Sequence, residues 1–141
     1  MIWAVALALA LFGLCGFVHF LMIRQVQTHI ARSSLGRSER MLVGFYAAGL
    51  AHLIEAGLYA VGFWFGRMAG LGSFKSIEGP VGMMETYYFS LVNYTSLGLG
   101  DIYPTGHLRF LAGVESLNGF LLISCSAAFI FVLMTDPEDK I

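Results

Sequence analysis

The segment Tyr94–Asp101 places two hydroxyl residues before two glycines, which are separated by one residue and followed by an aspartate. Glycine adopts backbone conformations that other residues avoid, so alternate glycines let a chain turn successive carbonyl oxygens to one side. A row of carbonyl oxygens can replace the water around a dehydrated cation. The segment therefore predicts a cation site built from backbone oxygens, which needs no catalytic side chain.

The composition around this segment is that of an integral membrane protein. Of 141 residues, 57% are hydrophobic and 12% are charged, about half the charged share of a soluble domain. Crossing a bilayer takes about 20 apolar residues, and three stretches are long enough: Met1–Ile23, Met41–Phe65 and Leu108–Met134. Irregular backbone at membrane depth is tolerated only where it is buried in protein or lines a water-filled path.

The charge distribution predicts the orientation of the chain in the membrane. The linker 24–40 holds four of the eight basic residues, and such an excess marks a cytoplasmic loop. The N-terminus is then expected outside, and the short tail 135–141 in the cytoplasm. No basic residue precedes the apolar core of the first span, so we interpret it as a retained transmembrane helix and not a signal peptide.

Between the second and third spans, residues 83–95 are too few to cross the membrane. Pro80 and Gly82 precede about a dozen residues without glycine or proline, which is typical of a helix start, and Glu85 in the first turn favours the helix dipole. The chain then returns through the glycine segment to Pro104. We predict an all-α membrane protein with three transmembrane helices, a re-entrant pore helix and a loop at its end.

The run from Tyr88 to Asp101 resembles the pore helix and selectivity filter of potassium channels, whose carbonyl-lined filter reads TVGYG. In the family an aspartate follows this filter. Both glycines and the aspartate match, at Gly98, Gly100 and Asp101. Residues 101–104 resemble the outer mouth of that family, and Arg109 is followed ten residues later by Gly119, the place of the inner-helix hinge. The resemblance covers about 41–134, with an outer helix at 41–65, a filter at 96–101 and an inner helix at 108–134; the first span, 1–23, lies outside it.

The resemblance implies a homotetramer in the cell membrane that conducts potassium ions, with no enzymatic activity, cofactor or nucleic-acid partner. The ions would bind the backbone carbonyls of the filter residues Ser96, Leu97, Gly98, Leu99 and Gly100. Four residues would support the filter: Thr95, Asp101, Tyr87 and Tyr88. Four more would form the cavity and hinge: Gly119, Phe120, Ile123 and Ala127.

Leu99 departs from the family pattern, in which an aromatic residue follows the first filter glycine. The change removes a hydroxyl that bonds behind the filter, so Tyr87 and Tyr88 lose that partner. The side chains of Leu97 and Leu99 are expected to point away from the pore, into the protein. A weakly selective sodium and potassium channel is one alternative; a non-conducting membrane subunit and a histidine-ligated redox protein are others.

Ionisable residues also fall at membrane depth, where they usually face protein, water or a partner. His52 and Glu55 lie one helical turn apart, as do Glu115 and Asn118. We expect them to meet behind the pore helix as a structural network; the alternatives are a proton- or metal-sensing element, and haem or metal catalysis. His19 is expected to be a packing residue. No histidine spacing matches a metal motif such as HExxH, so potassium in the filter is the only metal ion expected.

Overall fold

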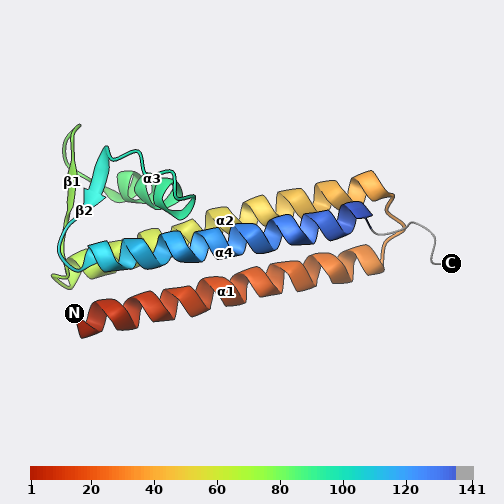
Figure 1. The fold of residues 1–141 in the computed structure, drawn as a ribbon, viewed down its shortest axis with the longest axis horizontal. Coiled ribbons are helices and arrows are strands. Elements are labelled where there is room, and N and C mark those ends of the chain that lie inside the picture. The colour runs from red at the N-terminus through yellow and green to blue at the C-terminus, as the bar shows by residue number, and fades with distance from the viewer. Residues whose placement is uncertain (136–141) are drawn as a thin grey trace.

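Three long helices form the body of the protein in the computed structural model, which describes residues 1–135. Helices α1 (Ile2–Ala31), α2 (Arg37–Met68) and α4 (Leu108–Thr135) pack side by side, and the short helix α3 (Met83–Tyr94) lies at one end of them (Figure 1). Each long helix is long and apolar enough to cross a membrane. The predicted helical membrane fold is confirmed.

The first two helices extend beyond the predicted membrane spans. Helix α1 continues past Ile23 to Ala31, and α2 begins at Arg37, so the predicted linker 24–40 shortens to residues 32–36. No glycine or proline interrupts residues 24–31. The start of α2 is fixed by Glu39, whose carboxylate accepts the amide hydrogen of Gly36 at 3.1 Å. Residues 136–141 of the predicted tail lie outside the described residues.

Two three-residue strands, β1 (Phe74–Ser76) and β2 (Ile102–Pro104), pair antiparallel beside α3, with Lys75 opposite Tyr103. These strands are not predictable from the sequence, because three residues are too few to show an alternating pattern. The pairing brings together the two ends of the segment that contains α3 and the glycine loop. The paired strands therefore hold the two ends of that segment together.

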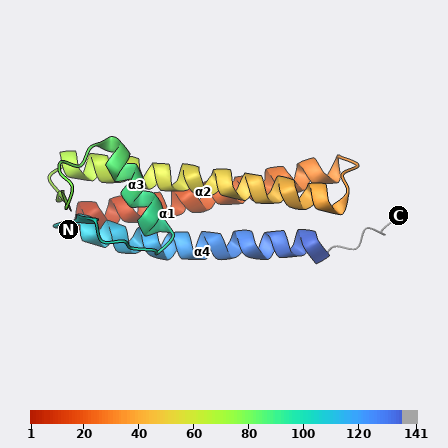
Figure 2. The ribbon, with the colours of Figure 1, turned by 90° about the horizontal axis from the view of Figure 1, so that it is seen from above.

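Helix α3 lies across α2 and α4 (Figure 2). An aromatic cluster holds its middle in place: Phe63 of α2, Phe74 of β1 and Phe89 of α3 pack edge to face, with ring centroids 5.0, 5.3 and 5.5 Å apart. Edge-to-face contacts between aromatic rings add to the stability gained by burial. The cluster joins the two ends of the α2–α3 connection.

The two ends of the bundle differ. Helix α3, the strands and the N-terminus lie at one end, and the 32–36 connection lies at the other (Figure 1). The glycine loop begins where Tyr94 contacts Glu55, near the middle of α2, so the basic residues around that connection lie well away from it along the bundle. This separation agrees with the predicted topology, and the direction in which the bundle sits in a membrane stays a prediction.

Candidate ion-binding site

The glycine loop begins where α3 ends in a hydrogen-bonded stop. The amide of Ser96 donates to the carbonyl of Asn93 at 2.9 Å, and the amide of Leu97 donates to the carbonyl of Val92 at 3.0 Å. This pair of bonds is the Schellman motif, which usually has glycine at the position of Ser96. The motif is not predictable from the sequence, because serine and not glycine occupies that position.

Left-handed backbone recurs at every second residue of the loop. The φ angle is 60° at Ser96, 57° at Gly98 and 79° at Gly100, whereas Leu97 and Leu99 have negative φ. Such alternation turns successive carbonyl groups toward one side, as a row of cation-binding oxygens requires. Serine in this region is strained by about 1 kcal/mol or more. The loop thus keeps its alternation even where a glycine is missing.

The two leucines of the loop are uncovered in the single chain. Leu97 is 64% exposed and Leu99 is 58% exposed, so the expectation that they point into the protein is not met within one chain. The predicted cavity residues Phe120, Ile123 and Ala127 are exposed as well. Apolar side chains at the loop and on the adjoining face of α4 therefore lack cover from their own chain.

Gly119, predicted as a hinge, is buried where α4 meets the end of α3. A Cβ atom at this position would lie 2.0 Å from the carbonyl oxygen of Tyr94, well inside contact distance. The close approach of two backbones gives a reason for glycine here that is separate from bending. The hinge function stays a prediction.

Residues predicted to support the filter make hydrogen bonds at the surface of α3. Tyr88 donates its hydroxyl to Asp101 Oδ2 at 2.9 Å, and Tyr87 donates to the carbonyl of Leu53 at 3.0 Å. Both tyrosines thus have hydrogen-bond partners, although position 99 carries leucine and not an aromatic residue. The bond to Asp101 raises the pKa of Tyr88. Thr95 ends α3, and its hydroxyl donates back to the carbonyls of the preceding turn.

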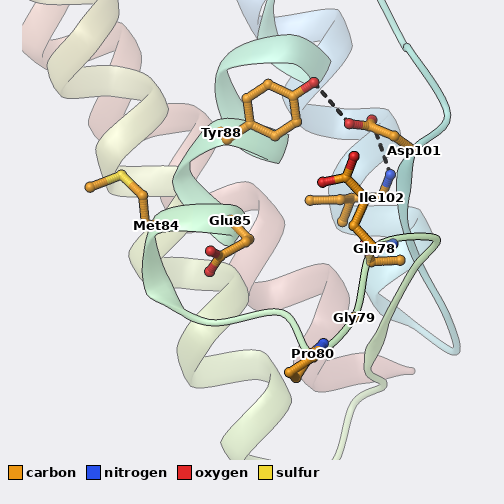
Figure 3. Close-up of a pocket in the computed structure, with 9 residues that line it drawn as sticks. Glu78, Gly79, Pro80, Met84, Glu85, Tyr88, Asp101 and Ile102 are labelled. Atoms are coloured by element: carbon orange, nitrogen blue, oxygen red, sulfur yellow. Dashed lines mark hydrogen bonds between the residues drawn. The ribbon is translucent and has the colours of Figure 1, made fainter.

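A pocket of about 480 Å³ opens beside this bond, between α3 and the start of β2 (Figure 3). Three carboxylates line it, those of Glu78, Glu85 and Asp101. Glu85 also accepts the amide hydrogen of Gly82 at 2.9 Å, which caps the start of α3. Carboxylates gathered at one end of the protein raise the local concentration of cations there.

Comparison with known protein families supplies an assignment for this geometry. A family model described as an ion channel matches residues 56–136, which is more than half of the chain. The chain belongs to this ion-channel family. The match begins within α2 and covers α3, the loop and α4, so the resemblance to a two-helix channel pore domain is confirmed. No curated protein matches the chain, and no solved structure does.

In this member of the ion-channel family, Glu115 of α4 is fully buried and bonded to α3, the helix that precedes the glycine loop. It accepts hydrogen bonds from the hydroxyl of Ser90 and, at 2.6 Å, from the side-chain amide of Asn93. Ser90 also contacts the carbonyl of Ala56 at 2.6 Å, and Asn93 donates to that of Ala112 at 2.8 Å. These bonds hold the pore helix against both α2 and α4.

Glu55 of α2 is equally buried in the channel chain. It has hydrogen-bond partners on α1, on its own helix and on α3. His19 Nδ1 lies 3.0 Å from its Oε1, His52 Nδ1 lies 3.1 Å from its Oε2, and the Tyr94 hydroxyl donates to Oε2 at 2.5 Å. The part played by His19 was missed because this residue lies on another helix, 36 positions from Glu55. Periodicity within one helix carries no signal for such a contact.

The four polar residues predicted to form one network, His52, Glu55, Glu115 and Asn118, do not all meet. His52 contacts Glu55 as expected. Glu115 bonds to the pore helix, and Asn118 donates to the hydroxyl of Tyr59 at 3.0 Å. The single group expected behind the pore helix is thus divided, because Glu115 and Asn118 point to different neighbours of α4.

Proposed function

We propose that this chain forms a homotetrameric potassium channel, in which residues Ser96–Gly100 of four chains line one pore. The observation that carries the proposal is the alternating left-handed backbone at Ser96, Gly98 and Gly100, at the end of a short helix that does not cross the membrane. Membership of the ion-channel family supports ion conduction. The potassium selectivity and the number of subunits are our inference.

A single chain offers oxygens on only one side of an ion, so a closed ring of carbonyls needs copies of the loop around an axis. The uncovered side chains of Leu97 and Leu99 are consistent with such copies, since an adjacent chain can cover them. The exposed face of α4 at Phe120, Ile123 and Ala127 would line the cavity below. The negative C-terminal end of the pore-helix dipole would favour a cation in this cavity.

Within the filter, we assign potassium to the backbone carbonyls of residues 96–99, with the Ser96 hydroxyl at the inner end. Gly100 and Asp101 would form the outer edge. The bond from Tyr88 to Asp101 would hold that edge on the pore helix. Thr95 would fix the other end of the loop through its bonds to the last turn of α3.

Leu99 favours a second candidate, a channel that conducts sodium as well as potassium. Its side chain carries no hydroxyl to restrain the filter, and it is exposed in the single chain. A filter held less firmly discriminates less well between cations of different size if selectivity depends on a fixed cavity. The two candidates share the same pore and differ only in its selectivity.

Ion flux into liposomes separates these candidates. Purified protein is reconstituted, and flux is measured under a potassium gradient and under an equal sodium gradient, with empty liposomes as the control. Flux of potassium well above that of sodium is expected. Equal fluxes would favour the weakly selective channel, whereas no flux from folded protein would reject conduction. The mass of the detergent-solubilised protein, measured by light scattering, should correspond to four chains.

A further inference from the structure

Three potential metal ligands converge between α1 and α2, below the end of the pore helix. His19, His52 and Glu55 each offer one ligand atom, and these atoms lie within 4.8 Å of one another. The side chain of Glu55 is fully buried, that of His19 is 3% exposed and that of His52 is 20% exposed. The cluster is therefore shielded by protein, with one partly open side at His52.

Two imidazoles and one carboxylate form a ligand set that zinc takes in sites with an open coordination position. Zinc holds nitrogen and oxygen ligands at about 2.1 Å, so neighbouring ligand atoms in a tetrahedral site lie about 3.4 Å apart. The Glu55 oxygens lie 3.0 Å from His19 Nδ1 and 3.1 Å from His52 Nδ1. A metal ion could thus replace these hydrogen bonds with only small movements of the side chains.

Groups around the cluster orient its ligands. The second ring nitrogen of His19 contacts the hydroxyl of Ser126 on α4 at 3.3 Å, and Tyr94 bonds to the Glu55 carboxylate. The rings of His19 and His52 stack with centroids 5.2 Å apart. Metal-binding histidines usually have their other nitrogen hydrogen-bonded in this way, which fixes the ring and its tautomer.

The charge of the cluster also favours a cation. Glu55 is buried at membrane depth, where an ionised carboxylate without a counter-charge is costly. Its hydrogen-bond partners are two imidazoles and a phenol. A divalent ion between the ligands would supply a counter-charge to the carboxylate.

We propose that His19 and His52, through Nδ1, and Glu55, through its carboxylate, bind a divalent transition-metal ion of the zinc class. The ion would fasten α1, which precedes the matched pore domain, to α2. Because Tyr94 bonds to Glu55, the site is also joined to the last turn of the pore helix. The site is independent of which cation passes the filter.

Cobalt provides a direct probe, because its visible absorbance reports the coordination geometry of sites that also take zinc. Untagged full-length protein in detergent is titrated with Co²⁺, and the bound ion is then displaced with Zn²⁺. One ion per chain is expected. His52→Ala and Glu55→Gln should each weaken binding more than about 100-fold, and Ser126→Ala about 10-fold to 100-fold. His29→Ala removes an imidazole near the end of α1 and should leave binding unchanged.

Folding of every variant is checked by its helical circular dichroism and its elution volume. His52→Gln retains a hydrogen-bonding group toward Glu55 and is used if His52→Ala does not fold. The proposal is overturned if folded wild-type protein binds no cobalt, since the cluster then holds only protons. Equal affinity in wild-type protein and in the folded His52 variant would also overturn it.

Discussion

The pore helix and the loop that follows it differ in how the chain holds them. Ser90, Asn93 and Tyr94 of α3 form side-chain bonds to groups on α2 and α4. In the loop, by contrast, Leu97 and Leu99 are more than half exposed. A single chain thus fixes the helix that carries the loop and leaves the loop itself available to other chains.

This difference separates two kinds of mutational effect. Changes at the contacts of the pore helix should lower the stability of each folded chain, because they remove bonds or packing within it. Changes in the loop should alter conduction while the fold of the chain persists. Substitutions in each region therefore test whether the two are held independently.

Gly119→Ala should have the largest effect on stability. The added methyl group would meet the backbone carbonyl of Tyr94, which cannot move aside like a flexible side chain. We expect a loss of about 3 kcal/mol or more, measured by denaturant unfolding in detergent micelles. Gly113→Ala on the same helix is the control, since nothing lies within 4 Å of its added Cβ. Equal stability of the two variants would contradict the close contact of α3 with α4.

Glu115→Ala is expected to have an intermediate effect. It removes the hydrogen bonds to Ser90 and Asn93 and leaves a cavity, although both partners keep a second bond to a backbone carbonyl. A loss of about 2 kcal/mol is expected in the same unfolding assay. Glu115→Gln preserves the volume and can bond to both partners, so it should cost less. A glutamine variant as unstable as the alanine variant would show that charge and not hydrogen bonding is required.

The smallest effect is expected at the exposed bond between Tyr88 and Asp101. Tyr88 donates this bond only while protonated, so it is present at neutral pH and lost as the pH rises through the raised pKa of the hydroxyl. Asp101→Asn should lower the pKa of Tyr88 toward its ordinary value. The titration is followed by NMR of ring-labelled tyrosine, with Tyr88→Phe to assign the signal. An unchanged pKa would show that the bond does not form.

Much of the fold could be predicted because it depends on local patterns. Long apolar stretches predicted the three membrane helices, and Pro80, Gly82 and Glu85 predicted the start of the pore helix at Met83. Helix ends were less predictable: residues 24–31 are mostly polar and follow the apolar span, yet no glycine or proline among them breaks a helix. The strands escaped prediction because their pairing depends on contacts between distant residues.

Of the candidate site, the glycines of the loop could be located from sequence because their spacing is itself the signal. The left-handed backbone at Ser96 could not, since serine rarely adopts it. The contact of His19 with Glu55 is not predictable from the sequence either, because its partner lies on another helix. Contacts between helices decide the role of such a residue, and one sequence does not contain them.

The assignment of the filter is tested by potassium flux through liposomes that contain Gly98→Ala. Gly98 has a φ of 57°, which alanine adopts only at a cost, so the substitution should distort the carbonyl row. Gly113→Ala on α4, where an added Cβ meets nothing within 4 Å, serves as the matched control. We predict that flux is lost in Gly98→Ala and retained in Gly113→Ala, with both proteins folded. Unaltered flux in Gly98→Ala would contradict the assignment of residues 96–100 as the filter.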